Sequence, residues 1–100
     1  MKKDIEQIHI EFNDKAQESF FVLCQQFEQA VGHIDRERDD NVFHQSLGKF
    51  AYTLKYDLDM MARSFLDKYQ TQHNVSLLQK AFTNTILRYT HEFTQKCRAH

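Results

Sequence analysis

Apolar side chains recur at steps of three and four residues along nearly the whole chain, which is the spacing of one face of an α-helix. Proline is absent and only two glycines occur among the 100 residues, so the residues that usually form hairpin and strand turns are scarce. No apolar run approaches the roughly 20 residues that a membrane-spanning helix needs. The pattern therefore predicts an all-α protein built from long amphipathic helices.

Two polar stretches divide the periodic pattern into three segments. Residues 35–41 contain no apolar side chain, and residues 70–74 separate the second segment from the third. These breaks predict three helices, over residues 4–33, 40–70 and 74–97. Short polar connections between long helices favour antiparallel neighbours, so we expect a single domain over residues 1–100, an antiparallel up-down-up three-helix bundle.

Single residues mark expected helix ends and an expected helix crossing. Gly32 stands at the end of the first predicted helix, where a residue in the left-handed conformation commonly closes a helix. Gly48 lies inside the second, where a glycine costs about 1 kcal/mol relative to alanine. We expect Gly48 to permit a close crossing of two helices. Asn74 or Ser76 is the expected N-cap of the third helix.

The charges argue against nucleic acid as a partner. The 13 Lys and Arg residues against 14 Asp and Glu residues give a formal charge of −1, which offers no large basic field to a phosphate backbone. A nucleic-acid binder would have to gather its basic residues on one surface: Lys2, Lys3, Lys49, Lys55, Arg63, Lys80 and Arg88.

The start of the chain and its cysteines indicate a compartment. The first four residues lead into an amphipathic segment and not into the apolar part of a signal peptide, so we expect a cytoplasmic protein without a membrane segment. Cys24 and Cys97 lie far apart in sequence and within helical pattern, which favours reduced thiols over a secreted disulfide framework.

The second predicted helix carries apolar residues on two sides. Tyr52, Tyr56 and Met60, at positions i, i+4 and i+8, form a stripe that faces away from the core line of this helix. Charged residues flank the stripe: Lys49, Asp59 and Arg63. Such mixtures of aromatic and charged residues are typical of protein interfaces. The alternative is that the second helix is central and that its two neighbours cover both sides.

The first predicted helix has a smaller apolar excess in Ile10, Phe21 and Val22, which lie off its main face. We therefore expect a non-enzymatic protein-binding module, a small regulator or inhibitor that docks a helix face onto another protein or onto a second copy of itself in a homodimer. Small helical proteins of this size recur among secretion chaperones, immunity proteins and inhibitors encoded by phages or other mobile elements, an analogy of size and class alone.

A metal- or small-cofactor-binding bundle is the alternative function. Glu6 and His9 have the Glu-x-x-His spacing of di-iron bundles, but the predicted core lines hold no further carboxylate. His33, His44 and Cys97 would share one end of an up-down-up bundle, and zinc accepts both ligand types, yet the trio has no motif spacing. No metal or cofactor is therefore expected.

Catalytic signals are weak. Cys24 and Ser46 are candidate nucleophiles, but no adjacent base, orienting group or oxyanion site accompanies either residue in the sequence. No glycine-rich phosphate loop is present. Residues 35–41 are a candidate recognition loop, although mixed charge usually serves to keep a connection in water. We expect no enzymatic activity.

Overall fold

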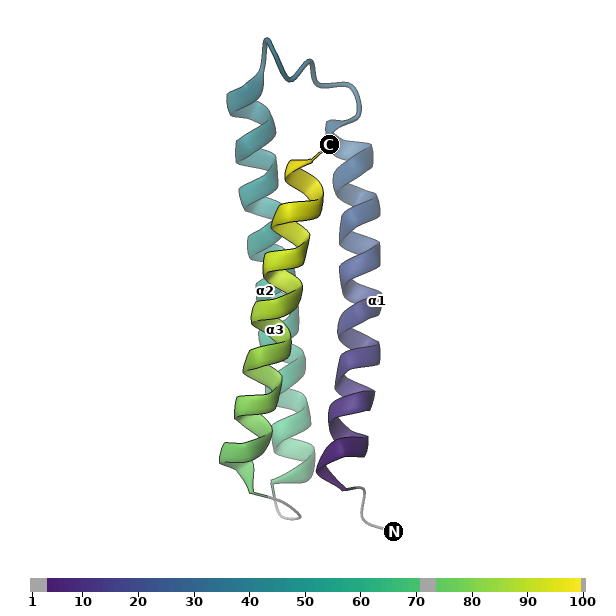
Figure 1. Ribbon diagram of the computed structural model, residues 1–100, viewed down its shortest axis with the longest axis vertical. Helices are drawn as coiled ribbons and strands as arrows, with labels where there is room; N and C mark the ends of the chain where they lie inside the picture. Colours follow the sequence, from purple (N-terminus) through teal and green to yellow (C-terminus); the bar gives the residue numbers. More distant parts are fainter. Residues whose placement is uncertain (1–3, 71–73, 100) are drawn as a thin grey trace.

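The three predicted helices are present in a computed structural model that describes residues 4–70 and 74–99. They are α1 (Ile5–Val31), α2 (Asp40–Tyr69) and α3 (Val75–Arg98), and they alternate in direction along a bundle that measures 55 × 19 × 17 Å (Figure 1). The predicted all-α bundle is confirmed, and each predicted helix end lies within two residues of the observed one. Lys2, Lys3 and residues 71–73 of the second connection lie outside the described residues.

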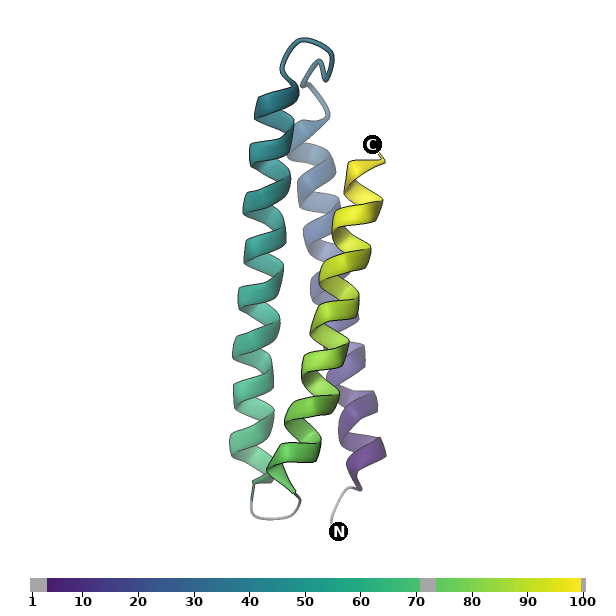
Figure 2. The same ribbon diagram turned by 60° about the vertical axis from the view of Figure 1, so that its left-hand side comes forward.

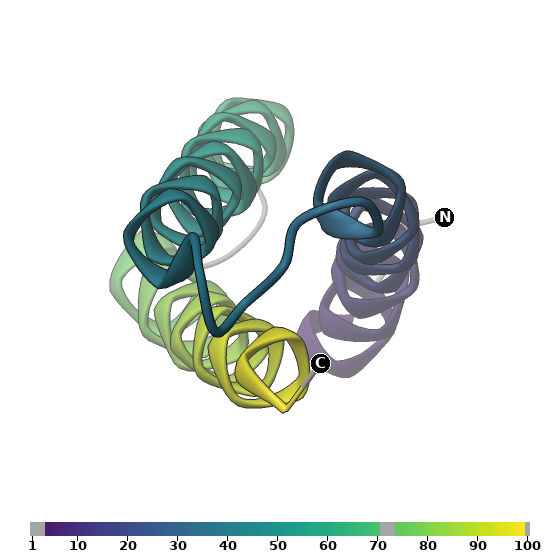
Figure 3. The ribbon, with the colours of Figure 1, turned by 90° about the horizontal axis from the view of Figure 1, so that it is seen from above.

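Each helix packs against the other two, so the bundle has a triangular cross-section (Figure 3). Near one end, the ring of Phe12 from α1 meets the rings of Phe65 and Phe82, with centroids 5.4 and 4.3 Å apart. Toward the other end, a second aromatic cluster joins the same three helices: Phe27, Phe43 and Phe93. Buried aromatic rings contribute large apolar areas, so these clusters hold both halves of the bundle together.

The N-termini of α1 and α3 are closed by side-chain caps. Asp4 accepts a hydrogen bond from the backbone N–H of Gln7 at 2.8 Å, and the Gln7 side chain accepts one from the backbone N–H of Asp4 at 3.1 Å. This reciprocal pair satisfies two donors that the first helical turn leaves open. Asn74, and not Ser76, caps α3, because its side chain accepts from the N–H groups of Ser76 and Leu77.

Helix α3 ends below the level of the connection between α1 and α2 (Figure 2). Among the described residues, no helix combines the length and the apolar character that crossing a membrane requires.

The first helix ends at Gly32 as predicted, but the left-handed conformation expected there and the close crossing expected at Gly48 are both wrong. Gly32 follows α1 with φ −60° and ψ −21°, a right-handed conformation, and the chain turns there through a hydrogen bond from the N–H of Ile34 to the carbonyl of Val31. Gly48 permits no close crossing, because a Cβ atom placed on it would meet nothing within 4 Å. The glycine lies on an exposed part of α2, where no other helix approaches it.

Replacement of this glycine should therefore stabilise the protein. We expect Gly48→Ala to raise the free energy of unfolding by about 0.5–1 kcal/mol, because alanine has less backbone freedom to lose on folding and its methyl group enters open space. Urea unfolding measures the change. Gly32→Ala is the matched control, since its Cβ would lie 3.0 Å from the carbonyl oxygen of Glu28 and its gain should be smaller. A loss of stability at Gly48 would contradict its open position.

Candidate protein-binding surface

A stripe of three large apolar side chains on α2 stays in solvent after the bundle has formed. The exposed fractions of Tyr52, Tyr56 and Met60 are 71%, 55% and 45%. Leu54 and Leu58, which alternate with them along the helix, are fully buried. Two residues correspond to about 200° of rotation, so the stripe stands on the side of α2 opposite to the core. The alternative, that helices of the same chain cover this side, is wrong.

A pair of opposite charges adjoins the stripe. The ammonium of Lys55 donates a hydrogen bond to the carboxylate of Asp59 at 3.2 Å, across one turn of α2. These two residues and the two tyrosines line a hollow of about 180 Å³. An exposed ion pair of this kind contributes little to stability. Its main effect is to place a donor and an acceptor beside the apolar stripe.

Lys49 and Arg63 extend the stripe in both directions. Each stands seven residues, or about two helical turns, from Tyr56, and both are exposed. Arg63 also lines a hollow of about 180 Å³ between α2 and α3, together with Gln79 and Thr83 of α3. The predicted residues of α2 therefore form one continuous surface, with an apolar middle and a cation toward each end.

The predicted residues of α1 belong to a different surface. Ile10 and Phe21 are exposed by 55% and 54%, and the ammonium of Lys96 from α3 lies 5.8 Å from the centre of the Phe21 ring. Phe21 thus faces the α1–α3 side of the bundle, which lies across from α2 in Figure 3. Val22 is 51% exposed and lines a hollow of about 380 Å³ between α1 and α2. The structure divides the predicted residues among separate surfaces.

The sequence analysis missed three exposed apolar residues: Val42 of α2, and Leu77 and Leu87 of α3. Leu77 and Leu87 of α3 are exposed by 54% and 58%. Each lies off the face of α3 that carries the core residues. Isolated apolar residues of this kind are common on protein surfaces. They offer matched control positions for tests of the α2 stripe.

The Glu-x-x-His pair does not face a carboxylate cluster. The Nε2 atom of His9 is hydrogen-bonded to Oγ1 of Thr85 at 2.8 Å, which links α1 to α3 through a neutral hydroxyl. Glu6 is exposed. Across residues 4–70 and 74–99, no three His, Cys, Asp or Glu side chains gather into a group that would hold a metal ion.

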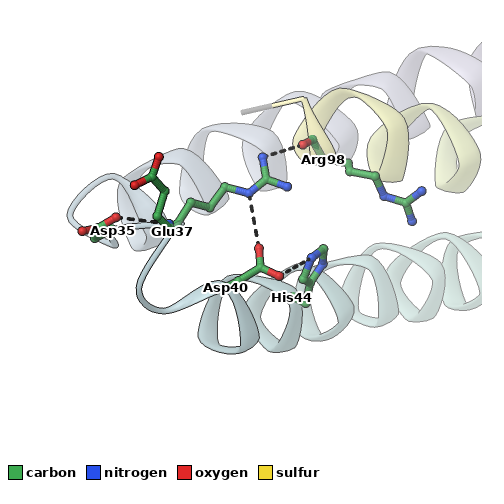
Figure 4. A network of polar contacts seen from close by, with 6 residues as sticks. Asp35, Glu37, Asp40, His44 and Arg98 are labelled. Atoms are coloured by element: carbon green, nitrogen blue, oxygen red, sulfur yellow. Dashed lines mark hydrogen bonds and ion pairs between the residues drawn. The ribbon is translucent and has the colours of Figure 1, made fainter.

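The proposed zinc ligands share one end of the bundle but do not converge. His33 and His44 are exposed, whereas Cys97 is only 1% exposed and lies inside the core. His44 instead lies beside Asp40, with Nε2 and Oδ2 3.3 Å apart, as Figure 4 shows. A buried thiol and two imidazoles in solvent cannot coordinate one ion without rearrangement of the bundle end.

Arg36, in the connection between α1 and α2, contacts its own chain. Its Nη1 donates a hydrogen bond to the backbone carbonyl of Arg98 at 2.9 Å, and its Nε lies 3.8 Å from Oδ1 of Asp40. Figure 4 shows the polar contacts around this end of the bundle. The guanidinium carbon also lies 4.1 Å from the centre of the Phe43 ring. Arg36 therefore gives residues 35–41 a structural role at the carbonyl end of α3, a role that charge composition did not predict.

The two cysteines lie side by side, which the sequence did not predict. Cys24 and Cys97 are free and buried, and they lie about one helical turn beyond Phe20 of α1 and Phe93 of α3, whose ring centres are 6.2 Å apart. Burial raises the pKa of the Cys24 thiol, while nearby Lys96 lowers it; burial and the neighbouring Cys24 raise the pKa of Cys97 to about 12. Thiols that stay protonated are poor nucleophiles, which weakens the case for Cys24 as a catalytic residue. Ser46 is half-buried near the start of α2.

The position of the α2 stripe leads to a stability prediction. Tyr56→Ala should change the free energy of unfolding by less than about 0.5 kcal/mol, because the side chain is mostly in solvent. Phe12→Ala should lower it by about 3–5 kcal/mol, because that ring is fully buried between two others. Urea unfolding of both variants measures the contrast. Similar losses for the two would mean that the stripe belongs to the core.

The buried thiols should make the fold sensitive to alkali. The pKa of Cys97 rises from 9.0 to about 12 on folding, so between these values the unfolded chain releases a proton that the folded chain retains. This contribution to stability is fully present below pH 9.0 and is lost as the pH rises toward about 12. Thermal unfolding between about pH 7 and pH 11 measures it. Cys97→Ala should show a shallower decline, and an equal decline in both proteins would contradict the assignment.

In comparisons with known proteins, the chain matches no protein-family model, no curated protein and no solved structure.

Proposed function

We propose that this protein is a non-enzymatic protein-binding module, a small regulator or inhibitor, that docks the stripe of α2 onto another protein. The observation that carries the proposal is the alignment of three exposed apolar side chains, Tyr52, Tyr56 and Met60, along one face of a helix. Covering apolar surface is favourable by about 25 cal/mol per Å². Tyr, Met and Arg are also the residue types that protein interfaces favour.

The bundle presents this stripe on a rigid support. The stripe occupies the middle of α2, a helix of 30 residues whose opposite side is buried along its length. Anchors at i, i+4 and i+8 suit the helix-in-groove mode of recognition, in which an apolar helix face enters a groove on the partner. Because the helix is already formed and packed, binding requires little ordering of the backbone.

The charges of the stripe favour a different protein over a second copy. In an antiparallel pair of stripes centred on Tyr56, Lys49 of one copy would face Arg63 of the other, and like charges in contact oppose association. We therefore propose a partner with an apolar groove and acidic side chains toward each end. The two cations lie about 21 Å apart along α2, at 1.5 Å per residue. Homodimerisation through the stripe is the competing outcome.

The proposed place of action is the cytoplasm. Both cysteines are free in the folded chain, which suits a reducing compartment. The buried thiols form part of the helix interface, so the reduced state supports the fold by itself.

Paired variants test the proposal. The immobilised wild-type protein is used for capture from an extract of the source cell, beside Tyr56→Glu/Met60→Glu and the control Leu77→Glu/Leu87→Glu. The control adds the same charge and also removes two apolar side chains that are about half exposed. We expect mass spectrometry to find a protein that the wild type and the control retain and that the stripe variant loses by at least about tenfold, a change of about 1.4 kcal/mol.

Circular dichroism and urea unfolding provide the folding control, because all three proteins should remain helical. Sedimentation equilibrium distinguishes a second copy from a different partner. If the stripe variant retains every captured protein, or if the control loses them equally, the α2 stripe is not the binding surface.

A further inference from the structure

The only two cysteines of the chain meet inside the bundle. Cys24 belongs to α1 and Cys97 to α3, and they follow Phe20 and Phe93 by four residues each, about one helical turn. The ring centres of Phe20 and Phe93 lie 6.2 Å apart. Because α1 and α3 run in the same direction (Figure 1), this contact places the two cysteines at the same level of the bundle. Their exposed fractions are 4% and 1%. A disulfide requires two sulfur atoms brought together from neighbouring backbone positions. The burial of both cysteines at the same level of neighbouring helices favours such a bond.

The location of Cys97 gives this pair a route to solvent. Cys97 lies in the last turn of α3, one residue before the helix ends at Arg98. Terminal turns open at a lower free energy than the middle of a helix, so the thiol is reachable without unfolding of the bundle. The hydrogen bond from Arg36 to the Arg98 carbonyl, 2.9 Å long, holds this turn in its closed position.

Two charged groups adjoin the thiols. Lys96 of α3 lowers the pKa of Cys24, and Glu28 of α1 raises the pKa of both cysteines. The ammonium of Lys96 lies 5.8 Å from the centre of the Phe20 ring of α1, so it remains close to the helix contact. When the terminal turn opens and water enters, the effect of burial on the thiols falls, and Lys96, which precedes Cys97 in the same turn, still favours the Cys97 thiolate.

We propose that Cys24 and Cys97 form a reversible redox pair, which a low-molecular-weight disulfide such as oxidised glutathione converts into an intramolecular disulfide between α1 and α3. The Cys97 thiol loses its proton and attacks one sulfur of oxidised glutathione, which releases the first glutathione thiolate. The Cys24 thiolate then attacks the Cys97 sulfur and releases the second. Two protein thiols and one oxidised glutathione yield one protein disulfide and two reduced glutathione molecules. Two electrons and two protons pass to glutathione.

The disulfide fastens the last turn of α3 to α1. It closes a loop that contains all of α2 and both connections, so it restricts the unfolded chain strongly. We expect the oxidised protein to unfold at a temperature higher by on the order of 10 °C. The α2 stripe does not include either cysteine, and this inference does not rest on the proposed partner.

Glutathione buffers test the inference on the full chain. The protein is equilibrated across ratios from fully reduced to fully oxidised glutathione, remaining thiols are blocked, and intact masses and non-reducing gels are recorded. The expected product is a monomer that has lost two hydrogen atoms, that unfolds at the higher temperature and that dithiothreitol restores. Free thiols at every ratio, a lasting glutathione adduct, or disulfide-linked dimers as the main product would overturn the proposal.

Cys97→Ala and Cys24→Ala are the controls. Neither should show the loss of two hydrogen atoms or the rise in unfolding temperature under oxidising buffer. If either variant folds poorly, the mass and the unfolding temperature of the wild-type protein still test the proposal. A rise of the same size in a folded single-cysteine variant would show that the stabilisation does not come from the Cys24–Cys97 bond.

Discussion

The contact of Phe12 with Phe65 and Phe82 is the interaction on which the rest of the structure depends, because each ring belongs to a different helix. A helix of this bundle does not bury its apolar face against a sheet or against a large domain. It has only two neighbours, and Phe12 contacts a ring from each of them. Large flat side chains satisfy this demand with few residues. The opposite sides of the helices are then left free of any packing role.

The helices and their order were predictable because burial imposes the period of the helix on the sequence. Phe43, Leu54 and Phe65, for example, lie on one side of α2 and are all buried. The same reasoning placed Tyr52 and Tyr56 on another side of α2. It did not decide whether a neighbouring helix covers them, because periodicity fixes the angle of a residue about its own helix and says nothing about the width of its neighbours.

The contacts between helices were not predictable for a related reason. The meeting of Cys24 with Cys97 depends on the register of α1 against α3, which arises from the packing of the whole interface. Arg36 posed the same difficulty, because its acceptor is a backbone carbonyl at the end of another helix and leaves no mark in the sequence. Gly48 was misinterpreted because a glycine inside a helix can mark a close helix crossing or a local break. At an exposed position such as this one, glycine is tolerated although it does neither.

The distribution of the tyrosines has an optical consequence. The chain contains no tryptophan and four tyrosines. Tyr52 and Tyr56 lie on the exposed stripe, whereas Tyr69 and Tyr89 are buried by the helix contacts. The near-ultraviolet spectrum therefore contains two populations of the same chromophore. One responds to whatever covers the outer face of α2, and the other responds to loss of packing, so the protein reports on docking and on unfolding without an added label.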